Sequence, residues 1–105
     1  MKHTEKMIQK ACLDYLEYYA KTHDIYWFRA GSGAVKTQQG RYFKTGKKGC
    51  PDICGCVHGI FTGWEIKSAI GRQSADQKTA EKEIKKAGGN YFIIRSLKDL
   101  KACLK

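Results

Sequence analysis

The sequence is poor in proline and in acidic residues. It has one proline, Pro51, against eleven glycines, and its ten Asp and Glu are outnumbered two to one by twenty Lys and Arg. At 105 residues the chain is long enough for one domain with a single core and too short for two. The formal net charge of +10 predicts a polyanionic partner. The alternative is a basic surface that only aids solubility.

Long apolar runs are missing as well. No stretch approaches the roughly 20 apolar residues that a membrane-spanning helix needs, and the N-terminal MKHTEKMIQK has no apolar segment of signal-peptide length. The five cysteines are odd in number, which without a signal peptide favours reduced thiols in a cytosol. We therefore expect a cytoplasmic protein that has no membrane partner.

Apolar spacing, caps and turn residues predict one α/β domain over residues 1–105. A helix is expected from about Glu5 to Lys21, and a second helix should open with the capping-box pair Ser74 and Gln77. Further elements are predicted as strands at 25–30, 51–57, 60–67 and 90–95 and as a last helix at 96–104. This order predicts a central mixed β-sheet flanked by helices.

Two acids and a lysine fall along the stretch KKGCPDICGCVHGIFTGWEIKS, residues 47–68. If VHGI is a two-residue hairpin turn in which Gly59 supplies the positive φ, the pairing register places Asp52 directly opposite Glu65. Side chains alternate between the two faces of a strand, so Lys67 shares a face with both acids. The three side chains are therefore predicted to converge.

Convergence of the two carboxylates predicts a divalent-metal site. Opposed residues have Cβ atoms about 4.5 to 5.5 Å apart, which lets two carboxylates share a hard cation such as Mg²⁺. Without a cation they would repel each other. With a basic protein, this arrangement suggests phosphodiester hydrolysis, in which Lys67 orients water or neutralises developing charge. The alternative is that Asp52 only caps a turn and Glu65 only pairs with a lysine.

The segments GCPDI and WEIK resemble the PD-(D/E)xK nuclease signature. Their setting, with TEKMIQKACLDYL, RAGSGAV, KKGCPDI and IGRQSADQ, resembles the VRR-NUC family over nearly the entire chain. The resemblance implies a restriction-endonuclease-like core and a DNA endonuclease that depends on Mg²⁺ or Mn²⁺. Stand-alone members, often from phages, are similar to Holliday-junction resolvases and act as homodimers. A bacterial or phage-infected cytosol is therefore expected.

The resemblance also assigns roles to particular residues. It implies catalytic roles for Asp52, Glu65, Lys67 and Gln77, and metal ligation by Glu5, Asp52, Glu65 and the carbonyl of Ile66. Glu5 has an alternative role as a first-turn acid that stabilises the helix dipole. For Gln77 the alternative is the capping box with Ser74.

A basic excursion between Gly31 and Gly49 is the predicted DNA-binding segment. It reads either as a long loop or as a short irregular hairpin, and its candidate phosphate contacts are Lys36, Arg41, Lys44, Lys47 and Lys48. No sequence-reading motif is recognisable, so DNA structure is the expected target, with a four-way junction as the first choice. The alternatives are a flap or nicking nuclease of the same chemistry and a non-catalytic DNA-binding module.

Two further features leave alternatives open. The cysteines Cys50, Cys54 and Cys56 depart from the commonest family pattern and, with His58, suggest zinc. Alternate strand residues lie about 7 Å apart, which does not suit a tetrahedral ion, so small buried side chains are the favoured interpretation. The implied homodimer could use tyrosines 15, 18 and 19 of the first helix, which could equally be core residues.

Overall fold

The N-terminal helix and the strand after it follow the apolar spacing of the sequence. The computed structural model describes residues 3–30, 34–36, 38–40, 42–44 and 47–104. Helix α1 spans Glu5–Tyr19 and strand β1 spans Ile25–Arg29. Thr4 caps α1 as expected, accepting the N–H of Met7 at 3.1 Å. The helix ends earlier than the predicted Lys21, because the N–H of Lys21 turns back three residues to Tyr18.

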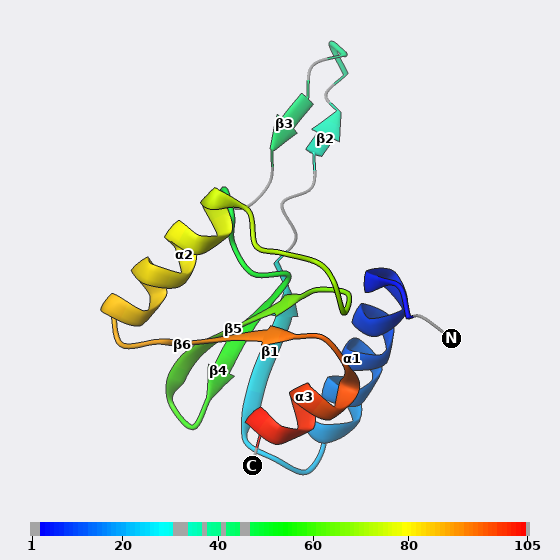
Figure 1. Cartoon of the computed structure of the whole chain (residues 1–105), viewed down its shortest axis with the longest axis vertical. Coiled ribbons are helices and arrows are strands. Elements are labelled where there is room, and N and C mark those ends of the chain that lie inside the picture. The colour runs from blue at the N-terminus through cyan, green and yellow to red at the C-terminus, as the bar shows by residue number, and fades with distance from the viewer. Residues whose placement is uncertain (1–2, 31–33, 37, 41, 45–46, 105) are drawn as a thin grey trace.

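The remaining elements confirm the predicted order, and the basic excursion forms a hairpin. They are β2 (Ala34–Lys36), β3 (Tyr42–Lys44), β4 (Ile53–Val57), β5 (Ile60–Ile66), α2 (Ala75–Lys86), β6 (Asn90–Ile94) and α3 (Leu97–Cys103). Strands β1, β4, β5 and β6 form a mixed sheet in that order, in which only β6 runs parallel to its neighbour β5. Hairpin β2–β3 stands away from the sheet (Figure 1).

The register of β4 on β5 is the predicted one. Ile53 lies opposite Trp64 and Val57 lies opposite Ile60, so the ladder extends toward Asp52 and Glu65. The turn residues His58 and Gly59 both have positive φ, at 53° and 81°, as the two-residue hairpin turn requires. This turn therefore fixes which side chains share a face of the sheet.

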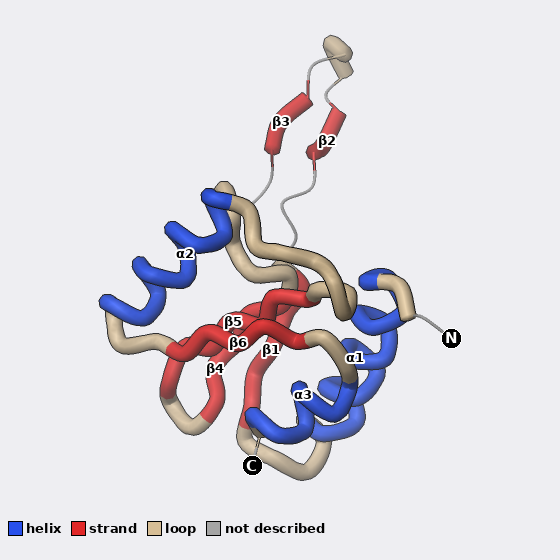
Figure 2. The backbone as a smooth tube through the Cα atoms, viewed as in Figure 1, coloured by secondary structure: helices blue, strands red, loops and turns tan. Residues whose placement is uncertain are grey.

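Each face of the sheet has its own covering helices. Helices α1 and α3 lie together on one side and α2 lies apart from them across the strands (Figure 2). The core between the sheet, α1 and α3 contains Ile8, Cys12, Leu16, Ile53, Trp64, Ile66, Ile94, Leu100 and Leu104. Helix α2 packs on the opposite face through Ile84, which lies beside Gly63 and Gly89. The acids and the lysine are on the α2 side.

Caps hold the two later helices where the sequence predicts them. Ser74 accepts the N–H of Gln77 at 3.2 Å and Ser96 accepts the N–H of Asp99 at 3.3 Å. Helix α2 ends before Gly88, whose φ of 94° suits glycine. Among the helices that the structure describes, none is both long and apolar enough to cross a membrane.

Candidate active site

The structure brings the two acids and the lysine together at one end of the sheet. Asp52 precedes β4, and its Oδ2 accepts the backbone N–H of Ile66 at 2.8 Å. Its own carbonyl oxygen accepts the N–H of Ala30, 2.9 Å away, which ties the segment to the end of β1. Lys67 Nζ lies 3.8 Å from Glu65 Oε2. The predicted convergence of these three side chains is therefore confirmed.

Glu65 is an acid in an unusually dry environment. Only 2% of the residue is exposed, and Gln77 Nε2 donates to its Oε2 at 3.0 Å. Its Oε1 is buried with no hydrogen-bond partner. Burial first, and then the negative charge of Asp52, raise the pKa of Glu65 from its ordinary 4.5 to about 8. Burial and the charge of Asp52 therefore favour the protonated form of this carboxyl group when no cation is bound.

Lys67 is nearly buried beside these acids. Its side chain is 11% exposed, and its backbone N–H donates to the carbonyl of Ile94 at 3.0 Å, which extends the pairing of β5 with β6. A Cβ built at Gly71 would lie 3.4 Å from Lys67 Cδ, so the following loop packs along the lysine stem. The ammonium group thus has a fixed position next to Glu65.

Gln77 forms the capping box that the sequence offered as its alternative role, and it also contacts Glu65. Its Oε1 accepts the backbone N–H of Ser74 at 2.9 Å, which completes the capping box. Its Nε2 donates to Glu65 Oε2. One amide therefore stabilises the first turn of α2 and fixes the orientation of the buried carboxyl group.

The contacts of Asp52 and Glu65 suit a divalent cation. The buried, unpartnered Oε1 of Glu65 faces no donor, and the adjacent charge of Asp52 destabilises its ionised form. A cation would remedy both, because hard divalent ions bind carboxylate oxygens. Asp52 and Glu65 are therefore suited to hold one, and the carbonyl of Ile66 belongs to the same strand end.

Glu5, the third predicted carboxylate ligand, is the first residue of α1. Its charge raises the pKa of Glu65, although it is the smallest of the causes, so the start of α1 lies on the site's side of the molecule. Within the described ranges, however, no group of three His, Cys, Asp or Glu side chains is arranged to hold a metal ion. Metal ligation by Glu5 therefore stays a prediction.

The predicted DNA-binding lysines are only partly described. Lys47 and Lys48 are exposed. Lys47 Nζ lies 3.4 Å from Glu83 Oε2, and Lys48 Nζ lies 3.5 Å from Asp76 Oδ2. These two ion pairs link the end of the excursion to α2. Exposed pairs of this kind contribute little to stability. Lys36 and Lys44 lie on β2 and β3, whose side chains are not described, and Arg41 lies outside the described residues.

The cysteines near the site are free thiols. Cys50 donates to the carbonyl of Ala30 at 3.1 Å. Cys54 is buried, and burial is the main cause that raises the pKa of its thiol to about 11. Cys56 is exposed, and His58 lies in the hairpin turn. At least Cys50 and Cys54 are thus accounted for by packing against neighbouring backbone.

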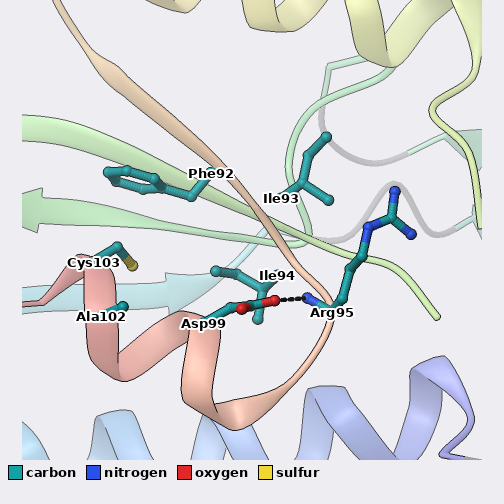
Figure 3. A pocket seen from close by; sticks show the side chains of 7 residues that line it. All are labelled: Phe92, Ile93, Ile94, Arg95, Asp99, Ala102 and Cys103. Atoms are coloured by element: carbon teal, nitrogen blue, oxygen red, sulfur yellow. Dashed lines mark hydrogen bonds between the residues drawn. The ribbon is translucent and has the colours of Figure 1, made fainter. Parts of the chain in front are cut away.

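Sequence reasoning missed Arg95, at the end of β6. Its guanidinium Nη1 donates to the carbonyls of Ser68 at 2.6 Å, Gly71 at 2.8 Å and Ala69 at 3.4 Å. Its backbone N–H donates to Asp99 Oδ2 at 2.9 Å (Figure 3). Arg95 therefore holds the loop that follows Lys67. An arginine at a strand end carries no sequence signal for such a contact.

The hollow beside Arg95 is a different place from the acidic site. It is lined by Phe92, Ile93, Ile94, Arg95, Asp99, Ala102 and Cys103 (Figure 3). None of the converging acids contributes to it. We therefore assign the candidate active site to the sheet end that carries Asp52, Glu65 and Lys67.

The protein is thus an α/β domain with a buried glutamate, a half-buried aspartate and a lysine at one end of a mixed sheet. Comparisons of the chain with protein-family models, with curated proteins and with solved structures find no match.

Proposed function

We propose that the protein is a divalent-metal-dependent DNA endonuclease of the PD-(D/E)xK type, similar to the VRR-NUC family. The observation that carries the proposal is the buried Glu65 beside Asp52, with one carboxylate oxygen unpartnered and an ammonium group 3.8 Å away. A domain that only bound DNA would gain nothing from acids next to phosphates unless a cation intervened. A helix, three antiparallel strands, a helix and a parallel strand agree with a restriction-endonuclease-like core.

Each side chain of the site then has a definite task. Asp52 and Glu65 would hold Mg²⁺ or Mn²⁺ together with the carbonyl of Ile66. When bound, such an ion polarises a phosphate and lowers the pKa of water. Lys67 presents a localised positive charge where negative charge develops on the phosphate oxygens or where water must be oriented. Gln77 keeps the Glu65 carboxylate in one orientation.

The charge of the chain supports a nucleic-acid substrate. A net charge of +10 attracts phosphate backbones without reading sequence. We propose a branched DNA, first a four-way junction, cut by a homodimer that carries two sites. A flap or a nicking site in duplex DNA would require the same chemistry at one site only.

The decisive experiment compares cleavage of labelled four-way junction, flap and linear duplex DNA with Mg²⁺, Mn²⁺ or EDTA. Asp52→Ala should abolish cleavage and keep the fold, and Lys67→Ala should lower the rate by about 10² while metal binding persists. Asp14→Ala is the matched control, because it removes an exposed carboxylate from α1. Cleavage by Asp52→Ala at the wild-type rate would refute the site. Binding to all three DNAs without cleavage under any metal would indicate a non-catalytic module.

A further inference from the structure

Three large aromatic side chains are exposed on the face of the sheet that carries the acids. Tyr26 is 70% exposed, and Phe28 and Phe61 are each 45% exposed. Tyr26 lies opposite Cys56 on β4, and Cys56 lies opposite Phe61 on β5. Phe28 lies one pair further along β1, opposite Cys54. We call Tyr26, Phe28, Cys56 and Phe61 the aromatic sheet face.

The packing of α2 explains why this surface is open. Helix α2 lies over β5 and β6, where Ile84 fits against the glycines Gly63 and Gly89. Tyr26, Phe28 and Cys56 are exposed, so the part of the chain that the structure describes leaves these three side chains of β1 and β4 uncovered. The rings of Tyr26 and Phe28 have centroids 6.4 Å apart, and exposed apolar patches of a few hundred Å² are often functional.

The chemistry of the surface indicates what covers it. None of its four residues carries a formal charge, although the chain has twice as many basic as acidic residues. Surfaces that hold single-stranded nucleic acid interleave aromatic rings with cations. The centres of protein–protein interfaces are instead enriched in aromatics and depleted of charge. Two copies that each carry +10 can meet most readily where their surfaces are neutral.

The exposed area is large enough for such a contact. A fully exposed aromatic side chain presents about 200 Å², so the three rings together expose about 300 Å² at their observed fractions. Two copies would bury about 600 Å² through these rings alone, more than half of the roughly 1,000 Å² of a specific interface. Neighbouring backbone and Cys56 would add to this area.

We propose that the aromatic sheet face joins two copies of this chain across a two-fold axis. Dimerisation at this face does not require nuclease activity; only its use for paired cuts rests on the proposed function. Cys54 is two residues from Asp52 on the same face of β4 and lies opposite Phe28. Both acidic sites would therefore adjoin the interface.

Helix α1, the other expected interface, is less suited. Tyr15 and Tyr19 stack on each other with ring centroids 5.7 Å apart and pack against the core. Only Tyr18 of this trio is largely exposed, at 68%. It therefore provides a matched control: an exposed aromatic side chain on a different surface.

The test measures the mass of the full chain in solution by light scattering, from about 1 to 100 μM. Wild type and Tyr18→Glu should be dimers. Tyr26→Glu and Phe61→Glu should be monomers, because each places two like charges in a neutral contact. Circular dichroism verifies that the variants are folded, which the exposure of both sites favours. A second measurement, binding of single-stranded oligonucleotides in EDTA, is made on the same four proteins.

The outcomes separate the possible occupants. Dimers that dissociate only in the Tyr26 and Phe61 variants support the proposal, whether or not the protein cleaves DNA. A wild type that is monomeric at every concentration overturns it, as does a dimer that survives both substitutions or that Tyr18→Glu dissociates. A monomer whose oligonucleotide binding is lost only in the Tyr26 and Phe61 variants would assign the face to nucleic acid and would likewise overturn the proposal.

Discussion

Replacing Glu65 by glutamine should remove a pH dependence from the stability of the metal-free protein. The folded-state pKa of about 8 lies above the ordinary value of 4.5, so the folded chain binds this proton more tightly than the unfolded chain does. The contribution of Glu65 to stability is therefore fully present below pH 4.5 and is lost as the pH rises toward 8. Glutamine has no proton that titrates in this range, so the decrease in stability between pH 4.5 and pH 8 should be absent in Glu65→Gln.

The magnitude follows from the same two pKa values. Within the window each pH unit lowers the free energy of unfolding by about 1.4 kcal/mol. Between pH 5 and pH 8 the wild type should lose up to about 4 kcal/mol, which is a large share of the roughly 5 to 15 kcal/mol typical of a domain. Hydration of the site would reduce this value.

Urea unfolding in EDTA, followed by the fluorescence of Trp27 and Trp64, provides the assay at pH 5 and pH 8. The matched control is Glu17→Gln, which changes an exposed acid of α1 and should follow the wild type. Added Mg²⁺ should stabilise the wild type at pH 8 through preferential binding to the folded state and should leave Glu65→Gln nearly unchanged. Parallel pH profiles for wild type and Glu65→Gln would refute the reasoning.

Three further predictions concern the supports of the site. In urea unfolding, Gln77→Ala should destabilise the fold by about 1 to 3 kcal/mol more than Ser74→Ala. Both variants lose the helix cap, but only Gln77→Ala also removes the hydrogen-bond donor of Glu65 Oε2. Equal losses in the two variants would contradict this. Arg95→Ala should speed hydrogen exchange in residues 68–71 and acetylation of Lys67, whereas the exposed Lys98→Ala should change neither. Gly63→Ala should lower the melting temperature, at a cost of about 1 to 3 kcal/mol, because its Cβ would lie 2.5 Å from Pro51 Cγ; an unchanged melting temperature would show that Pro51 can move.

Local sequence rules were sufficient to predict that the two acids lie together. The turn at His58 and Gly59 allows one register, and alternation along β4 and β5 then assigns Asp52, Glu65 and Lys67 to one face. The helix caps were predictable for the same reason, since each depends on residues three positions apart.

Features that depend on packing between distant segments could not be predicted. The distance of Glu5 from the acids is set by how α1 lies on the sheet, which no spacing rule specifies. The contact of Arg95 with the carbonyl of Ser68 spans 27 residues. The exposure of Tyr26 and Phe28 could not be predicted either. Other elements can cover one face or both faces of an apolar, aromatic strand, and the sequence of the strand does not distinguish these cases.

The double contact of Gln77 also limits which residue can stand at the third position of α2. Capping boxes accept glutamate as readily as glutamine, and a glutamate would still bind the N–H of Ser74. Its second oxygen, however, would face Glu65 Oε2 without a proton to donate. An exchange that is conservative at most helix starts would here add a negative charge beside Asp52 and the buried Glu65. A sequence design that optimises α2 by itself would therefore accept glutamate in place of Gln77 and would disrupt the acidic site.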